Sequence, residues 1–464
     1  MRLTIIHPAI GHRRGQNYIR AWQMEALPAA AIAGLTPPGV DIRFYDDRME
    51  PIPYDEPTDA VAISLETYTA RRAYQIASEY RRRGVPVIVG GFHATLCPEE
   101  AERYAEAVVT GEAEQIWPQV IDDLRHGTLQ KRYRAESRPE LAAIRVDRRI
   151  FGNKRYLPIR LIETGRGCRF PCDFCAIQTF FERSYRTRPL PDILHEIATL
   201  KDGARLFFFV DDNFAGDMAL MRELLPPLAR LKVRWITQMS INAAHDEGFV
   251  AELAAAGCLA VLIGFESLNK ANLAAMNKDF NTMRGAAETT MRGGYAAALA
   301  NLRRHGIGVF GTFVFGYDHD SLEAFAEAAD FAIEQRLYIA AFNHLVPFPG
   351  TPLYQRLAGQ GRLRYDAWWL DPAYRYNEVP FTPASLTPGQ ITEHCIAARR
   401  RFYSWPSILS RGLDRAANFG AAFNGFKWRN YWPINLMHRT DITGRDGYPL
   451  GDETWPGELL EAAR

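Results

Sequence analysis

Short apolar segments alternate with amphipathic helical segments through the first third of this 464-residue chain, with a helical pattern at residues 71–83 as one example. Segments with the character of strands recur at residues 3–7, 40–45, 60–64, 87–89 and 107–110. Strands that alternate with helices form parallel sheets, because a right-handed crossover is the usual connection between parallel neighbours. Residues 1–135 are therefore predicted to form a doubly wound, Rossmann-like α/β domain.

A second series of alternating segments follows an irregular, charged stretch at 136–155, which contains Pro139 and is predicted to be a linker. Strands are predicted at residues 159–163, 206–210, 234–238, 260–263, 308–315 and 338–343. A complete β/α barrel uses eight such units in about 250 residues. Six units predict an incomplete (β/α)6 barrel of the TIM type over residues 156–355, with an open side that leaves room for a large substrate.

Residues 356–464 are rich in proline and aromatic residues, and helical spacing is clear only between about 388 and 402. We expect a mainly helical, partly irregular region on the substrate side of the barrel. Its aromatic rings have two possible uses: they can line a pocket for a flat or lipid-like substrate, or they can pack in a core.

Composition excludes several classes of function. Lys and Arg number 55 against 54 Asp and Glu, so no net positive field attracts nucleic acid. The sequence contains no run of 18 or more apolar residues, so it predicts no membrane span. The six cysteines do not resemble a secreted disulfide framework. A cytoplasmic enzyme with a small-molecule substrate is expected.

The strongest chemical motif follows the first strand of the second series and contains three cysteines, Cys168, Cys172 and Cys175, spaced CxxxCxxC. Three thiolates on one short loop can bind three corners of a four-iron four-sulfur cluster, which leaves one iron open to a small ligand. Phe174 lies between two of these cysteines and is expected to shield the cluster and contact its ligand. The motif predicts a catalytic metal site.

A zinc site is the alternative interpretation of the same motif. Zinc prefers four protein ligands when its role is structural. No fourth Cys or His lies near the motif in the sequence, so a distant residue such as His195 or Cys258 would have to supply it.

At this loop the chain resembles the radical S-adenosylmethionine (SAM) superfamily, whose defining motif is CxxxCxxC after the first strand of a partial barrel. The resemblance implies that the open iron chelates SAM, and that an electron cleaves SAM to methionine and a 5′-deoxyadenosyl radical. An external reductant of the flavodoxin or ferredoxin type is implied as well. The domain order up to about residue 355 is similar to that of the subgroup with an N-terminal cobalamin-binding domain.

The resemblance also implies SAM contacts at the ends of the barrel strands. Helix capping by Asp or Asn is the alternative role for residues 211–213, and a paired surface carboxylate is the alternative for Glu266. The strand at 311–316 can run along adenine or can be glycine-rich because it is crowded. The expected SAM contacts are Phe174, Asp211, Asp212, Asn213, Gln238, Ser240, Asn242, Glu266, Thr312 and Val314.

Cobalamin contacts are implied at the ends of the first-domain strands. The cobalt-binding DxHxxG segment of many cobalamin domains is absent, because residues 7–12 have the sequence HPAIGH. Some relatives bind cobalamin without that histidine, and an empty docking domain is the alternative. His93 can face the corrin ring or simply cap a helix. The expected cobalamin contacts are Ser64, Leu65, Glu66, Thr67, Gly90, Gly91, Phe92, His93, Gly111 and Glu112.

The leading hypothesis is a cobalamin-dependent radical SAM methyltransferase that methylates an unactivated carbon of a bulky, partly apolar substrate, which is lipid-like or planar. A second hypothesis is a radical SAM enzyme that catalyses cyclisation, ring rearrangement or carbon–carbon coupling, with cobalamin absent or not used for methylation. A third is a non-catalytic metal or redox-sensing module.

Overall fold

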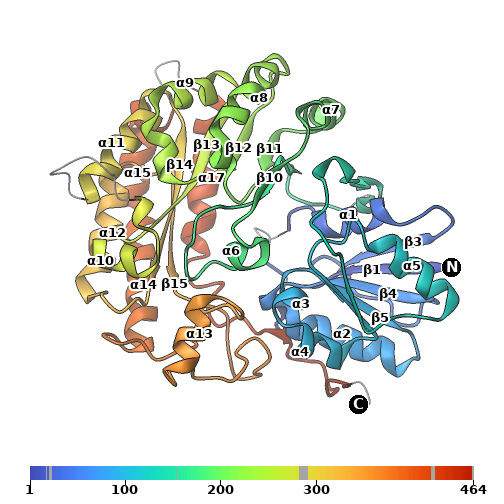
Figure 1. Ribbon diagram of the computed structural model, residues 1–464. Coiled ribbons are helices and arrows are strands. Elements are labelled where there is room, and N and C mark those ends of the chain that lie inside the picture. The colour runs from blue at the N-terminus through green and yellow to red at the C-terminus, as the bar shows by residue number, and fades with distance from the viewer. Residues whose placement is uncertain (17, 20–22, 153, 282–290, 420–423, 462–464) are drawn as a thin grey trace.

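Two parallel sheets dominate the computed structural model, which describes residues 1–464 except 17, 20–22, 153, 282–290, 420–423 and 462–464 (Figure 1). The first sheet lies in the blue N-terminal part, and the second forms the wall of a partial barrel beside it (Figure 1). Among the helices built from described residues, none has the length and apolar character that crossing a membrane requires.

The first sheet has six parallel strands in the order β3-β1-β4-β5-β6-β7. This order confirms the predicted doubly wound fold. The short edge strand β7 was not predicted, because only its central Tyr133 is buried and no apolar run marks it. The strands are β1 (Arg2–His7), β3 (Asp41–Asp46), β4 (Ala60–Ser64), β5 (Val87–Gly90), β6 (Ala107–Thr110) and β7 (Arg132–Arg134).

Helices cover both faces of this sheet because successive strand residues point to opposite sides. Val61 and Ile63 of β4 belong to one apolar core, whereas Ala60 and Ala62 belong to another. Helices α2 and α4 contribute to the first core, and α1 and α5 to the second. The helices are α1 (Leu27–Leu35), α2 (Ala70–Arg82), α3 (Phe92–Leu96), α4 (Pro98–Tyr104) and α5 (Trp117–His126).

The second sheet also has six parallel strands, in the order β15-β14-β13-β12-β11-β8. The first and last strands of this sheet in sequence order, β8 and β15, lie at its opposite edges. The barrel is therefore open between them, as predicted. Its strands are β8 (Ile159–Ile162), β11 (Leu206–Phe209), β12 (Trp235–Gln238), β13 (Cys258–Glu266), β14 (Gly308–Phe315) and β15 (Ile339–His344).

Along these strands, fully buried residues alternate with half-buried ones. In β14, for example, Phe313 is buried in the core with the helices, while Phe310 and Thr312 are half-buried and face the lumen. The helices of the barrel are α6 (Ala176–Phe181), α7 (Leu190–Leu200), α8 (Met218–Arg230), α9 (Glu247–Ala255), α10 (Lys270–Ala275), α11 (Met291–Arg304) and α12 (Leu322–Glu334).

The C-terminal region is mainly helical, as predicted. Helix α14 coincides with the segment in which helical spacing is clear in the sequence, and four further helices of described residues lie outside that segment. Apolar periodicity does not reveal the other helices clearly. Proline lies in the first turn of α13 and of α15, and Pro433 lies inside α17. The helices are α13 (Pro352–Gly359), α14 (Pro388–Phe402), α15 (Trp405–Leu413), α16 (Arg415–Phe419) and α17 (Gly425–Thr440).

Most aromatic residues of this region pack in cores. Trp368 and Tyr374 are buried in the core of the first domain, and Phe402 in the core of the barrel. Near the chain end, β16 (Gly451–Asp452) pairs with β2 (Gly11–His12). The C-terminal region therefore packs against both sheets.

Arg411 is the most deeply buried cation of the C-terminal helices. Its side chain is fully buried and donates hydrogen bonds to the carbonyl oxygens of Leu337, Tyr338 and Phe402. Its guanidinium carbon lies 3.8 Å from the centroid of the Phe402 ring. One side chain thus connects α15 to the start of β15.

Arg411→Met is expected to lower the melting temperature strongly. Methionine fills the volume but removes the three hydrogen bonds that the guanidinium donates to buried carbonyl oxygens, which costs about 3 kcal/mol of unfolding free energy at about 1 kcal/mol for each bond. Thermal unfolding followed by circular dichroism measures the effect. Arg149→Met is the matched control, because the Arg149 side chain is 91% exposed. Equal melting temperatures for the two variants would contradict the prediction.

Candidate functional site

The cysteine loop connects β8 to α6 and begins with a small hairpin. Strand β9 (Gly165–Gly167) pairs with β10 (Tyr185–Thr187) in antiparallel fashion. Gly167 has a φ of +87°, and a Cβ atom there would lie 2.1 Å from the carbonyl oxygen of Ser184. Only glycine allows the hairpin to close so tightly just before Cys168. Helix α6, which follows the loop, lies between the barrel and the first domain (Figure 1).

The three cysteines of the loop are free thiols in a protected environment. Cys172 is buried, and Cys168 and Cys175 are half-buried. Burial raises the pKa of Cys172 to about 12; Lys278 opposes this rise, and the charges of Cys175 and Cys168 add to it. All three cysteines lie on one short loop. Iron ions would stabilise the thiolates that burial disfavours, so these residues fit a cluster.

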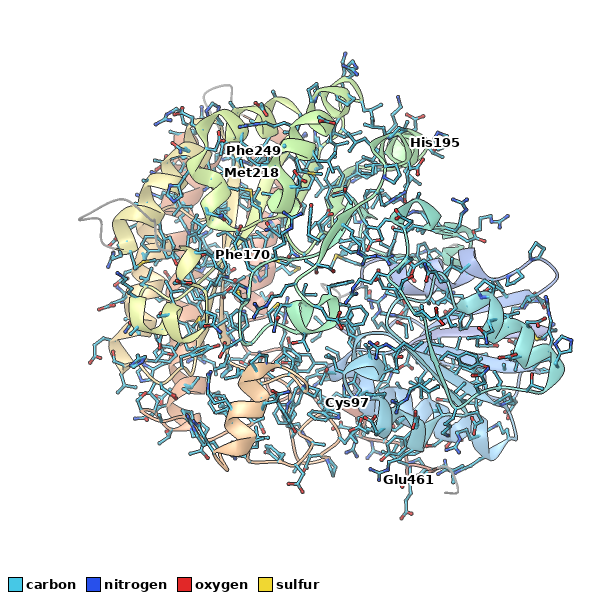
Figure 2. All side chains as sticks on the ribbon, viewed as in Figure 1. Cys97, Phe170, His195, Met218, Phe249 and Glu461 are labelled. Atoms are coloured by element: carbon cyan, nitrogen blue, oxygen red, sulfur yellow. The ribbon has the colours of Figure 1, made fainter. Side chains whose placement is uncertain are left out.

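The zinc alternative lacks its fourth ligand. Cys258 lies at the start of β13, at the opposite end of the barrel from the loop, and its thiol approaches the carbonyl oxygen of Ala260 at 3.6 Å. His195 is exposed on α7, far out on the barrel (Figure 2). Within the described ranges, no three Cys, His, Asp or Glu side chains converge on a single ion site. Cysteines around a cubane cluster each bind a different iron and need not converge in this way.

Asp173 fixes the middle of the cysteine loop. Its carboxylate accepts hydrogen bonds from the Tyr317 hydroxyl at 2.5 Å and from Arg356 at 2.7 Å. Its backbone carbonyl accepts from the amide of Leu353, and its amide donates to the carbonyl of Met276, both at 3.0 Å. The sequence gives no local signal for this role of Asp173, because its partners are more than 100 residues away.

Two aromatic residues of the loop contact the segment after α10. Phe170, at the centre of the molecule in Figure 2, stacks on Phe280 with ring centroids 3.7 Å apart. The Lys278 ammonium lies 6.0 Å from the centroid of the Phe174 ring. Phe174 itself packs at the edge of the barrel core. The loop is therefore packed on this side too.

Glu266 ends β13 in a strained conformation. Its φ is +63°, which is rare for a residue with a side chain, and the β13–β14 register shifts between Gly264 and Glu266. Its carboxylate accepts a hydrogen bond from buried Lys278 at 2.7 Å. Glu266 is thus ion-paired, and the pair borders the cysteine loop. Local strain of this kind concentrates at functional sites. Lys278 was not among the predicted site residues.

Asp211 follows β11 and is almost fully buried. One carboxylate oxygen accepts hydrogen bonds from the Thr164 hydroxyl at 2.7 Å and its amide at 3.2 Å, while the other has no hydrogen-bond partner among described atoms. Burial raises its pKa to about 7. The arrangement suits a cationic ligand group, which would supply the missing partner.

Asp212 and Asn213 connect neighbouring strand ends. Asp212 accepts a hydrogen bond from the Gly167 amide at 2.8 Å, and burial raises its pKa to about 6. The side-chain oxygen of Asn213 accepts from the amide of Ser240 at 3.2 Å. Neither residue caps the following α8, because Asp217 does so through the amide of Leu220. The helix-cap interpretation of residues 211–213 therefore finds no support.

The remaining predicted SAM contacts also lie at the carboxyl ends of the barrel strands or just beyond them. Four of these residues have side chains that make no hydrogen bond to described protein atoms: Gln238, Ser240, Asn242 and Thr312. Val314 is half-buried on the lumen side of β14. Polar groups without protein partners at one end of the lumen are consistent with a bound polar ligand.

In the first domain, the strand ends form a second site next to α6. Gly91 has a φ of +99°, and a Cβ atom there would lie 2.8 Å from the Leu65 carbonyl oxygen and 2.9 Å from the Ser64 hydroxyl. Gly90, and Gly111 with a φ of +76°, are likewise half-buried. The backbone is thus partly exposed at two neighbouring turns, after β5 and after β6, as close approach of a nucleotide tail requires.

Glu66 follows β4 at these strand ends, and together with Ser64, Gly91 and Gly111 it defines what we call the first-domain cleft. Its side chain is exposed, yet the enclosing protein raises the pKa of its carboxyl by desolvation. Phe92, which is half-buried at the start of α3, stacks on Phe180 of α6 with ring centroids 4.3 Å apart. The cleft therefore adjoins the helix that follows Cys175.

Four of the predicted cobalamin contacts are buried instead. Leu65 lies in the core, and the fully buried His93 ring contacts Thr67 through Nδ1 at 3.2 Å and Glu100 through Nε2 at 2.9 Å. Glu112 accepts hydrogen bonds from arginines on the cysteine hairpin and in the linker. These residues follow strand ends as predicted, but their side chains are buried in contacts with other parts of the protein, so the proposed cobalamin contacts below do not include them.

Asp211→Asn is expected to raise the melting temperature of the cofactor-free protein at pH 8 but not at pH 4. The folded-state pKa of Asp211 is raised from 3.8 to about 7, so the folded state prefers the protonated carboxyl. That contribution is fully present below about pH 4 and is lost as the pH rises to 7, by an amount on the order of a few kcal/mol. Asparagine stays neutral throughout.

Melting temperatures of the variant and the wild type across this pH range test the expectation. Asp202→Asn, at an exposed position, is the control. A difference that does not change with pH would contradict the interpretation of Asp211.

Comparison with known proteins places this geometry in a family. The family model described as the radical SAM superfamily matches residues 162–332. Bacteriochlorophyllide d C-12(1)-methyltransferase of Chlorobaculum tepidum is 31% identical over 400 residues, which cover 84% of this chain and 84% of that protein. Bacteriochlorophyllide d C-8(2)-methyltransferase of the same organism is 29% identical over 410 residues, covering 83% and 87%.

A solved structure shares the whole architecture. The radical SAM methyltransferase TsrM of Kitasatospora setae, solved with cobalamin and a [4Fe-4S] cluster bound, superposes with a TM-score of 0.61 at 17% identity, covering 95% of this chain and 99% of that one. At this identity the likeness is one of fold. The cysteine loop, the two parallel sheets and the first relative agree: the chain belongs to the radical SAM superfamily, in the subgroup with an N-terminal cobalamin-binding domain.

Proposed function

We propose that this protein is a cobalamin-dependent radical SAM methyltransferase that adds a methyl group to an alkyl carbon of a planar, chlorophyll-type macrocycle. The methyltransferases acting on bacteriochlorophyllide d support this substrate class, because each aligns with more than four fifths of the chain. The open barrel supports a bulky substrate.

The position of the cysteine loop between the barrel strand ends and the first-domain strand ends is the observation on which this proposal rests. The loop leads directly into α6, whose Phe180 stacks on Phe92 beside the first-domain cleft. On its other side, the loop amide of Gly167 is bonded to Asp212 at a barrel strand end. When bound, the cluster would supply the electron that cleaves SAM, and cobalamin would carry the methyl group.

The chain's own residues bind and orient these groups in the proposal. Asp211 and Asp212 accept the ammonium group of SAM, and the Lys278–Glu266 pair fixes the segment around its binding site. Ser64, Gly90, Gly91 and Gly111 allow the cobalamin tail to approach the backbone. Burial of the loop keeps water away from a reactive radical, which the protein has to protect from side reactions. An external reductant of the flavodoxin or ferredoxin type supplies the electrons.

Cys172→Ala is expected to abolish reductive cleavage of SAM, with a loss of at least about 1,000-fold in 5′-deoxyadenosine formation, because a cluster with two protein ligands is not retained. Anaerobic reconstitution with SAM and reductant, followed by product analysis, measures this. Cys258→Ala, at a buried cysteine in the opposite end of the barrel, is the control and should cleave SAM normally. Undiminished cleavage by the Cys172 variant would overturn the proposal.

Glu66→Trp is expected to weaken cobalamin binding at least about tenfold while leaving the melting temperature unchanged. The side chain is exposed within the cleft, so a large ring would fill space that the cofactor needs, at little cost to the fold. Titration of the protein with hydroxocobalamin, followed by absorbance, gives the affinity. Glu99→Trp, at an exposed position on α4, is the matched control. Equal affinities in both variants would place cobalamin elsewhere.

A further inference from the structure

A large apolar chamber occupies the lower lumen of the barrel, away from the strand ends that face the cysteine loop. Its volume is about 790 Å³, and it extends from the open edge between β8 and β15 to the inner faces of β11–β14. Helix α17 covers it from outside, with Phe426, Asn430 and Ile434 in its wall. A volume of this size is in the range that encloses a large organic ligand.

The chamber exists because the inward-facing residues do not fill the lumen. In a complete TIM barrel, layers of side chains from alternating strands pack the interior. This barrel has six strands instead of eight. Ala260 also faces the lumen with a small side chain, whereas bulky branched residues dominate this position in complete barrels. The half-buried side chains of Phe208, Ile236, Leu262 and Phe310 form an apolar wall around the remaining space.

Three arginines border the chamber at its outer end. Arg205 and Arg234 precede β11 and β12, and Arg429 lies on α17; all three line the chamber and have exposed side chains. In the described part of the chain, none of them has an acidic group within ion-pair distance. Arg234 stacks on Phe426, with 4.7 Å between the guanidinium carbon and the ring centroid. Guanidinium groups without acidic partners are well suited to binding a carboxylate.

We propose that the chamber binds the apolar body of the substrate and that Arg205, Arg234 and Arg429 bind its carboxylate. This inference rests on the proposed function, because a chlorophyllide is a planar apolar macrocycle with a free carboxyl group. From Arg205 to Phe209 the chain advances about 13 Å, at roughly 3.3 Å per residue. A macrocycle anchored at the arginines extends from there along the lumen toward Asp211 and Gln238, where the radical would be generated.

The test measures binding of chlorophyllide a and of its methyl ester to the reconstituted protein, by the fluorescence of the macrocycle. The wild type should bind the acid at least about tenfold more tightly than the ester, because only the acid pairs with the arginines. In Arg205→Met/Arg234→Met/Arg429→Met, the two affinities should become equal. Arg149→Met is the control and should keep the preference for the acid.

Filling the chamber should weaken the binding of both compounds. Ala260→Phe places a ring in the lumen, and Phe208→Trp is a second variant with a smaller increase in volume, in case the first does not fold. Each should bind acid and ester at least about tenfold more weakly than the wild type does, with the iron content after reconstitution measured as evidence of an intact barrel.

Two results would overturn the inference, and they differ in what they say about the proposed function. If the wild type binds chlorophyllide but the arginine and filling variants bind it equally well, the chamber is not the substrate site and the proposed function stands. If the wild type binds neither compound while it cleaves SAM, the proposed substrate class fails, and the inference fails with it.

Discussion

The buried carboxylate of Glu112 connects the two halves of the molecule. It follows the end of β6 in the first domain and accepts hydrogen bonds from Arg166 and Arg186, which stand on opposite strands of the hairpin that begins the cysteine loop. Burial alone would raise the pKa of Glu112, but the two arginines outweigh it and lower the pKa. Removing any one charge from such a buried network would leave the others without a partner, which is strongly destabilising. The network therefore fixes the position of the loop relative to the first-domain cleft.

Around that fixed loop, several polar groups are held in arrangements that do not favour stability. Asp211 keeps a buried oxygen without a partner, Glu266 adopts a left-handed backbone conformation, and buried thiols have raised pKa values. Such costs are tolerated where ligands compensate for them. The well-satisfied groups, such as Asp173 with its partners Tyr317 and Arg356, lie behind the loop and support it.

Local sequence signals were sufficient for the strands and the cysteine motif, because alternating burial and CxxxCxxC spacing are properties of short segments. They were insufficient for α15 and α17, where prolines and aromatic residues obscure the helical period. Local signals also could not predict which groups a side chain would contact. His93 and Glu112 follow strand ends as expected, yet both make hydrogen bonds to other protein side chains. Asp173 was missed because its partners Tyr317 and Arg356 are more than 100 residues away, and Lys278 because no local pattern shows that the chain turns back to pair it with Glu266.

The pairing of β16 with β2 joins residues that follow the barrel in the sequence to the first domain, which precedes it. Arg103 of α4 also forms an ion pair with Glu461. During synthesis on the ribosome, β2 and α4 emerge early, but their partners β16 and Glu461 become available only after the whole barrel has been synthesised. The first domain therefore acquires this part of its native packing after the barrel has been made.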